Sequence, residues 1–356
     1  IQPYGIAADN NFYMTNHQDL IFVPEVELRD NQRMAEENPV RVEVERAVAK
    51  VVVSGVPEVV PHGDRIDNLK WGLDVTNMYT YWMRKMTFIA NSGGVPNEME
   101  QLNAGYREER YAEDPNFTRF SSWNGGNPVG QFEYLSGTPE LSKNFDDYDY
   151  TLENTMDAAD QRHDVTTRVV ISGTYTPNGF GSVATRNGGG ISFYYFKGNA
   201  IRVEAMRDMV NDRGQIPQEL RDAGLEQAIE NVLAWNPNAF NSPTASFSEG
   251  GINFYYQGVC YYTVLIRHFS NNMVPVLMGY GRYGVVRNNV YQLSINKIIG
   301  PGQPVINPPG TDPDDEDTSW ISADVNIMRW YIRNQNVEEF KYQGVAIRSG
   351  WLHPNA

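Results

Sequence analysis

The sequence predicts a mainly β protein built from β-sandwich domains, and three observations support this fold class. Apolar residues alternate with polar ones in many short runs, which is the two-residue period of a half-buried strand. The 21 Tyr, 31 Gly and 20 Pro among the 356 residues favour strands separated by turns. Helical spacing of apolar residues occurs in one region alone, which favours sandwiches over an α/β fold.

The predicted strands follow one another along most of the chain. Val40–Glu45 alternates and continues into Ala47–Val53, with a register shift near Arg46. Apolar residues from Leu69 to Val75 alternate in the same way. Five further runs have the same character: Thr167–Tyr175, Ile191–Phe196, Ile252–Tyr256, Val259–His268 and Asn289–Ile298.

One region, Val203–Trp235, predicts helix instead. Leu220, Leu225, Ile229 and Leu233 lie near helical spacing with acidic residues between them. Proline is favoured in the first turn of a helix, so we expect Pro217 to begin the second of two short helices.

A chain of this length accommodates roughly two domains, each with its own core. We place the boundary near residue 163, because a polar, acidic stretch precedes it and a new strand begins at Thr166. The predicted divisions are a sandwich domain at 1–163, a second at 164–303, an acidic Pro-rich linker at 304–319 and a strand segment at 320–356.

Composition and charge limit the function classes. The net charge is −15 and no basic run exceeds a pair, which argues against nucleic acid as a partner. The single cysteine, Cys260, excludes an intramolecular disulfide and a Cys-based zinc site, and its apolar surroundings predict a buried, inert thiol. No stretch approaches the roughly 18 apolar residues of a membrane helix.

No motif predicts chemistry. The five histidines are dispersed, and no G-x-S-x-G elbow marks a nucleophile. We therefore expect no catalytic residue, no metal site, no cofactor and no enzymatic activity.

The C-terminal segment has the most informative pattern. Pro304–Asp317 predicts an exposed spacer, because prolines and clustered like charges resist packing. After it, Ile321, Ala323, Val325 and Ile327 alternate with polar residues, as in a half-buried strand. The apolar set then shifts to Met328, Trp330 and Ile332, which predicts a bulge or two short strands. Such a strand must complete a sheet, in its own chain or in a neighbour's.

The chain resembles the Bacteroidales (type V) fimbrilins, and is most similar to the short, or minor, fimbria subunit. Four blocks in the same order carry the resemblance: Val42–Val51, Tyr150–Thr155 leading into Thr166–Pro177, Val285–Ile295, and Trp320–Phe340. The resemblance implies two tandem transthyretin-like β-sandwich domains and a cell-surface subunit that supports adhesion. It also implies export as a lipoprotein to the outer membrane, with the leader absent here.

The resemblance further implies assembly by strand exchange between neighbouring subunits. In the family, an Arg-directed protease removes an N-terminal strand, and the C-terminal strand of the next subunit fills the groove. Carried over to this sequence, Pro304–Asp317 is the arm and the donor strand contains Trp320, Ile321, Ala323, Val325, Ile327, Met328, Trp330, Ile332 and Val337. Our own inference adds a strand that lines the acceptor groove, with Val40, Val42, Val44, Val48, Val51 and Val53.

Two departures from the family pattern bear on function. Few residues precede the first block, so we expect Ile1 to be a processed or trimmed end; Arg29, Arg33, Arg41 and Arg46 are the arginines that a protease could use. The chain also continues beyond Phe340, as a further strand or capping element.

The extension after Phe340 keeps a second hypothesis open: a tip or accessory adhesin that binds glycan or host protein. A third hypothesis is a secreted carbohydrate-active protein on a β-sandwich scaffold, for which 44 acidic residues offer many carboxylate pairs.

Overall fold

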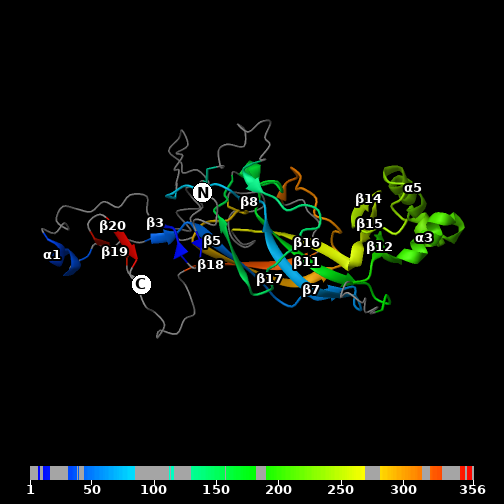
Figure 1. Ribbon diagram of the computed structural model, residues 1–356, viewed down its shortest axis with the longest axis horizontal. Coiled ribbons are helices and arrows are strands. Elements are labelled where there is room, and N and C mark those ends of the chain that lie inside the picture. The colour runs from blue at the N-terminus through cyan, green and yellow to red at the C-terminus, as the bar shows by residue number, and fades with distance from the viewer. Residues whose placement is uncertain are drawn as a thin grey trace.

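The computed structural model describes the greater part of the chain, and all structural statements concern those residues. They are 7–8, 11–16, 31–37, 39, 44–84, 112, 114–115, 130–156, 158–181, 190–268, 281–314, 321–330, 345–348 and 351–354. The molecule is elongated, with long strands in its middle, the helices of residues 203–235 near one end and the short helix of residues 32–37 near the other (Figure 1).

Two sheets form the middle of the molecule. The larger has the order β10 (Tyr148–Leu152), β5 (Val48–Ser54), β17 (Asn289–Ile299) and β18 (Ile321–Arg329), and β6 (Glu58–Val60) also pairs with β17. The smaller has the order β16 (Val259–Leu265), β11 (Arg168–Thr176) and β7 (Arg65–Asp74). The mainly β fold class is thus confirmed; β5, β7, β11, β16, β17 and β18 match runs that the alternation predicted, whereas β6 and β10 lie outside the predicted runs.

The strand β17 joins segments from distant parts of the sequence. It pairs in parallel with β5, from Val290 opposite Lys50 to Ser294 opposite Ser54, and then with β6. Its other edge pairs antiparallel with β18. All other strand pairs among the described residues are antiparallel.

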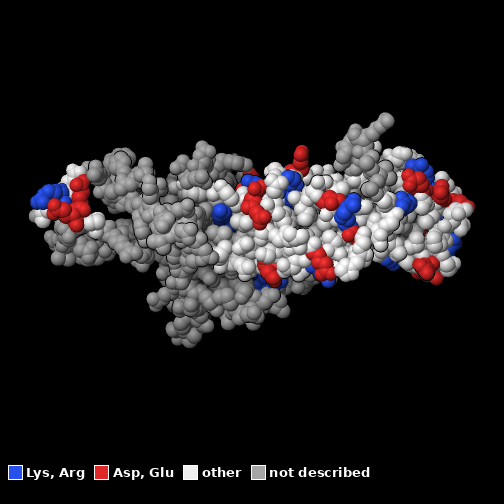
Figure 2. Space-filling view, turned by 90° about the horizontal axis from the view of Figure 1, so that it is seen from below, with Lys and Arg blue, Asp and Glu red and all other residues white. Residues whose placement is uncertain are grey.

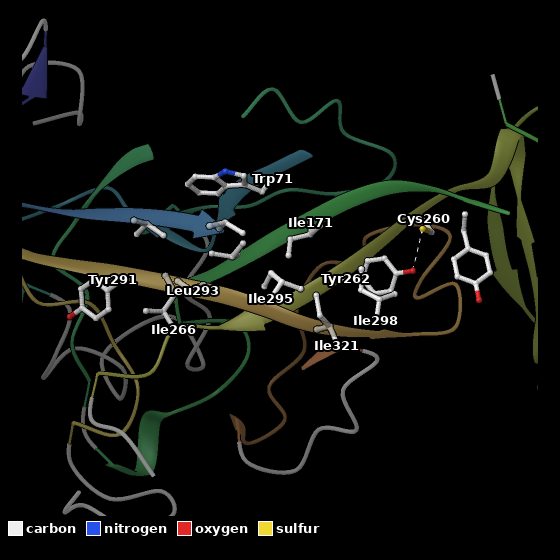
Figure 3. Packing of buried hydrophobic residues seen from close by; sticks show 14 of the residues in the cluster. Trp71, Ile171, Cys260, Tyr262, Ile266, Tyr291, Leu293, Ile295, Ile298 and Ile321 are labelled. Atoms are coloured by element: carbon white, nitrogen blue, oxygen red, sulfur yellow. Dashed lines mark hydrogen bonds between the residues drawn. The ribbon is translucent and has the colours of Figure 1, made fainter. Parts of the chain in front are cut away.

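The main core lies between the two sheets (Figure 3). Because side chains alternate along a strand, about every second residue of β5, β11, β16 and β17 faces this core. Trp71 of β7 and Ile171 of β11 come from the smaller sheet, and Leu293 and Ile295 of β17 come from the larger one. These four side chains are at most 1% exposed. The two sheets therefore form a β-sandwich.

A second unit is inserted in the chain between β11 and β16, which pair with each other in the smaller sheet. Its sheet has the order β13 (Asn199–Arg202), β12 (Phe193–Phe196), β15 (Ile252–Tyr255) and β14 (Phe247–Glu249). Its helices are α3 (Val203–Asn211), η5 (Arg213–Gln215), α4 (Gln218–Asp222) and α5 (Leu225–Trp235). A separate apolar cluster, which includes Tyr194, Ile229 and Phe254, packs the helices on the sheet. The helical region is confirmed, but it contains three α-helices and a 3-10 helix rather than the two short helices predicted, and Pro217 lies at the N-cap of α4.

On the face in Figure 2, acidic and basic side chains are interspersed over this helical unit. One ion pair joins Arg213 to Glu230 at 2.7 Å.

Short elements complete the described structure. They are β1 (Ala7–Ala8), β2 (Asn11–Phe12), β3 (Met14–Asn16), α1 (Gln32–Glu37), β4 (Val44–Arg46), β8 (Thr76–Asn77), β9 (Phe132–Glu133), η4 (Ala158–Asp160), η6 (Tyr256–Gly258), β19 (Val345–Arg348) and β20 (Trp351–Pro354). The last two form a hairpin in the extension beyond Phe340. No described helix has the length and apolar character needed to cross a membrane.

Strands from both sides of residue 163 build the sandwich. The segment 1–163 contributes β5, β7 and β10, and the segment 164–303 contributes β11, β16 and β17. The two segments share both layers and one core, so residue 163 does not separate two cores here. The polar stretch before it connects the layers, and hydrogen bonds fix part of it; the Asn154 amide nitrogen, for example, donates to the Val165 carbonyl and the Thr167 hydroxyl.

The Pro-rich segment departs from its prediction as an exposed spacer. Backbone bridges join Gln303 to Tyr261, Ile306 to Gly137 and Pro313 to Arg162. Ile306 is buried beside the outward-facing Val170 of β11, and Asp314 is buried, where its carboxylate accepts from Thr166 at 2.6 Å. Residues 303–314 therefore cross the outer face of the smaller sheet. Hydrogen bonds from this segment to the sandwich therefore outweigh the favourable hydration of its carboxylates.

Leu293→Ala should lower the free energy of unfolding by about 2–5 kcal/mol, because the lost side chain leaves a cavity in the main core. Urea unfolding measures this change. Ser294→Ala, one residue along β17 on the other face, is the matched control. An equal loss in both variants would contradict the sandwich core.

Cys260 should be unreactive while the protein is folded. Burial raises the pKa of this thiol to about 12, from about 8.5 in an unfolded chain. Unfolding thus releases a proton above pH 8.5, so this group lowers the stability of the fold as pH rises toward 12. A disulfide reagent at pH 8 should label no thiol in buffer and one in denaturant. Rapid labelling of the folded protein would show that β16 is exposed.

Candidate strand-exchange site

The strand β18 forms an edge of the larger sheet. Its register with β17 runs from Asn289 opposite Arg329 to Ile298 opposite Ile321, with an irregularity between Ile295 and Lys297. No described strand pairs with the other edge of β18. An edge strand with one bare side is the element that strand exchange requires.

The two faces of β18 agree with the predicted alternation. Ile321 belongs to the main core, and Ala323, Val325 and Ile327 pack against it. The intervening Ser322, Asp324 and Asn326 are exposed, as is Met328. The apolar shift predicted at Met328 and Trp330 is not a bulge within β18. Trp330, just past the strand, is buried in a different cluster.

The candidate acceptor residues that the structure describes lie in two strands, with Val48, Val51 and Val53 in the central strand β5 and Val44 in β4. Val51 and Val53 of β5 face the main core, whereas Val48 faces the cluster that contains Trp330. Both edges of β5 are occupied, one by β10 and the other by β17. The structure therefore brings the candidate donor and acceptor strands into one sheet, with β17 between them. The edge that receives β18 belongs to β17.

The turn that leads into β17 is held by buried polar groups. Arg287 is 1% exposed, and its Nε donates to Glu153 Oε2 at 3.0 Å. Its second terminal nitrogen donates to the Thr80 hydroxyl and to the Tyr81 carbonyl, each at 3.0 Å. A buried charge is tolerated when it is paired and hydrogen-bonded in this way. Arg287 thereby ties β17 to β10 and to the segment after β8.

Asn288 joins three strands at the same corner. Its N–H donates to the Val48 carbonyl at 2.9 Å, and its carbonyl accepts the Trp330 N–H at 3.2 Å. Its side-chain Oδ1 accepts the Arg46 N–H at 3.3 Å. Its φ is 60°, a left-handed conformation that asparagine adopts more readily than most residues. The corner therefore connects β5, the end of β18 and β4.

Trp330 lies in an aromatic cluster on the outer face of the larger sheet. Its ring stacks on that of Tyr150 of β10, with the ring centroids 5.5 Å apart. It also makes an edge-to-face contact with the ring of Phe12 of β2, with the centroids 5.1 Å apart. The Arg46 guanidinium lies over both Trp330, at 4.7 Å, and Phe12, at 5.3 Å. These four residues, Phe12, Arg46, Tyr150 and Trp330, are called the Arg46 cluster below.

Hydrogen bonds and an ion pair fix the strand that carries Arg46. Three residues of β3 pair with β4, and the Ala47 N–H donates to the Tyr13 carbonyl at 3.0 Å. The neighbouring Glu45 is buried and pairs with Arg84 at 2.8 Å. Burial raises the pKa of Tyr13, and the nearby Arg287 charge opposes this shift.

The structure leaves part of the predicted site undescribed. Val40, Val42, Trp320, Ile332 and Val337 lie outside the described residues. Sequence reasoning used the block Val285–Ile295 for the resemblance but assigned it no role. The Asn288-Asn289 pair was the available signal, since asparagine is enriched at left-handed backbone positions. No sequence pattern predicts the contacts of Phe12 and Arg46 with Trp330, because these residues are far apart in the sequence.

The similarity to a known protein family concerns this part of the chain. Residues 253–336 match the family model "Major fimbrial subunit protein type IV, Fimbrillin, C-terminal". The match spans β15 to β18 and thus includes the Asn288 corner and the candidate donor strand. The resemblance to fimbrilins is confirmed for this segment. No curated protein sequence matches the chain.

Two solved structures similar to this chain come from Porphyromonas gingivalis and Parabacteroides distasonis. A fimbrilin from Porphyromonas gingivalis W83 is 16% identical with a TM-score of 0.35, over 83% of this chain and 61% of the other. A putative cell adhesion protein from Parabacteroides distasonis ATCC 8503 is 12% identical with a TM-score of 0.31, over 82% and 61% of the two chains. The chain thus spans about three fifths of the length of these proteins.

Arg287→Met should lower the free energy of unfolding by about 3–5 kcal/mol, because it leaves the Glu153 carboxylate buried without its cation. The double variant with Glu153→Met should lose less than this single variant. Denaturant unfolding measures both. Arg65→Met, which breaks the exposed pair with Asp67, is the control and should cost under about 1 kcal/mol. Strictly additive losses would show that the two buried charges do not interact.

Proposed function

We propose that this chain is a structural subunit of a bacterial surface fimbria that assembles by exchanging β18 between neighbouring copies. The observation that carries the proposal is the docking of β18 on the edge of β17, within the segment that matches the fimbrillin model. The same edge in a neighbouring copy offers an identical acceptor. Exchange of an identical element between copies is a low-cost route to assembly.

The energetics of exchange favour a controlled process. An incoming β18 makes the same hydrogen bonds to β17 and buries the same inner row as the strand that it replaces. The free energy gained by replacing a chain's own β18 with that of a neighbour is therefore close to zero. The chain's own β18 also has the advantage of a high effective concentration, because it is covalently linked to the sheet. Free subunits thus stay closed until something weakens the docking of β18 in its own chain.

The path of the chain limits the reach of an exchanged strand. Residues 303–314 are anchored on the smaller sheet, so residues 315–320 alone span the distance to the donor strand if this anchor holds. Six extended residues cover roughly 20 Å. Neighbouring subunits in the fimbria would then be in direct contact, and the arm is shorter than the full Pro304–Asp317 stretch.

The proposal includes processing, surface location and adhesion. We propose that an Arg-directed protease removes the N-terminal strands; Arg33 in α1 and Arg46 in β4 are the candidate arginines in described elements. The subunit is proposed to reach the outer membrane as a lipoprotein precursor and to act in a polymer with accessory fimbrial proteins and host ligands. The resemblance supports these steps.

A disulfide between β17 and β18 tests strand exchange. Gln292 and Asn326 are opposite each other in the register, and opposing residues are close enough to be bridged. The variant Gln292→Cys/Asn326→Cys, in a Cys260→Ala background, should remain monomeric when oxidised and form oligomers after processing and reduction. Light scattering after size exclusion measures the mass.

The control carries its bridge elsewhere in the sheet. Val52→Cys/Tyr148→Cys joins β5 to β10 and leaves β18 untethered. It should assemble in both redox states. If the β17–β18 bridge leaves assembly intact, β18 is not exchanged and the proposal fails. If neither protein assembles under any condition, the tip-adhesin hypothesis replaces it.

A further inference from the structure

We propose that the Arg46 cluster is a latch, meaning a set of contacts through which the N-terminal strands β2 to β4 hold β18 in its own chain. The latch deepens the proposed function, since it supplies the control that strand exchange needs, and its role in assembly rests on that function. The coupling itself is a property of the folded monomer and is testable without assembly.

The first step of the argument is the burial of Trp330. This residue follows an edge strand, where a large side chain would ordinarily be exposed, yet it is only 4% exposed. The strands beside it do not explain this burial alone. Phe12 and Arg46, from the N-terminal strands, close the side of the ring that Tyr150 leaves open.

The second step is that the cluster is closed on itself. Phe12, Tyr150 and Trp330 make three mutual ring contacts, with centroids between 5.1 and 5.5 Å apart. The Arg46 guanidinium lies over two of these rings, and its backbone N–H is bound by the same Asn288 whose carbonyl holds Trp330. Loss of any member therefore removes contacts from the others.

The third step is that the strands β2 and β3 have few other strand pairings. Among the described residues, β3 pairs only with the three-residue β4, and β2 pairs only with the two-residue β1. Short pairings of this kind open at low free-energy cost. Beyond these pairings, the segment is fixed by the aromatic contacts of Phe12, by the ring contact of Tyr13 with Trp82 and by the hydrogen bond from Ala47 to Tyr13. Coupling is reciprocal, so the segment stabilises the end of β18 as much as Trp330 stabilises the segment.

The consequence is a mechanism for release. When the N-terminal strands are absent, Trp330 loses Phe12 and becomes exposed, and the end of β18 opens first. The inner row from Ile321 to Ile327 remains docked until the strand peels from this end. An intact N-terminus thus keeps the subunit closed, and its removal favours exchange with a neighbour.

Hydrogen exchange on the monomer tests the coupling. Arg46→Met removes the charge and keeps most of the side-chain packing. It should speed amide exchange in both 11–16 and 321–330 by about 2- to 30-fold, the range that a cation–π contact provides. Phe12→Ala should speed exchange in 321–330, and Trp330→Ala should speed it in 11–16. Peptides from β11 are the internal reference for intact folding.

The matched control removes a cation from another ring on the same face. Lys50 lies over Tyr148 at 4.1 Å, on strands that belong to neither terminal segment. Lys50→Met should leave exchange in 11–16 and 321–330 unchanged, and Arg46→Lys should retain most of the protection. The latch is refuted if Phe12→Ala speeds only its own segment, or if Lys50→Met acts as strongly as Arg46→Met.

The two proposals fail in different ways. Uncoupled exchange rates with normal assembly would remove the latch and keep strand exchange. Coupled rates together with assembly of the bridged β17–β18 variant would keep the latch and remove strand exchange. If both hold, Phe12→Ala should assemble faster than the unmodified chain.

Discussion

The two-sided pairing of β17 is the constraint on which the rest of the structure depends. One edge takes up β5 and β6 in parallel, and the other takes up β18 antiparallel. Its inner face supplies Tyr291, Leu293, Ile295 and Ile298 to the core between the sheets. A strand used on both edges and one face leaves little freedom to its neighbours, so the larger sheet forms around it and the smaller sheet packs on that surface.

The corner before β17 shows how this arrangement is stabilised. Two parallel strands such as β5 and β17 must be joined by a long connection. Here the segments that this connection brings together meet at Arg287 and Asn288. The corner is polar and largely buried, so most of its groups need partners, which come from β4 and β5 and from residues just after β8, β10 and β18. Correct pairing of all these strands is therefore required at once. Cooperation of this kind specifies one arrangement more strongly than apolar packing alone.

In the proposed exchange, β18 makes the same contacts with β17 of its own chain or of a neighbour, so small free-energy terms would decide between closed subunit and polymer. The anchored 303–314 segment and the Arg46 cluster are two such terms, one at each end of β18. If exchange occurs as proposed, its control lies at the two ends of β18, away from the inner row of Ile321, Ala323, Val325 and Ile327 that packs on the main core.

The sequence by itself determined the local structure: the strands, the helices after Val203 and the inward row of β18 are patterns within one segment, and periodicity records which face is buried. Sequence similarity also identified the segment around β17 and β18. Only the tertiary structure decided that strands from both sides of residue 163 share one core, that Ile306 and Asp314 anchor the Pro-rich segment, and that Phe12, Arg46 and Trp330 meet. These pairings join residues up to hundreds of positions apart, and their energy depends on burial and geometry that exist once the chain has folded.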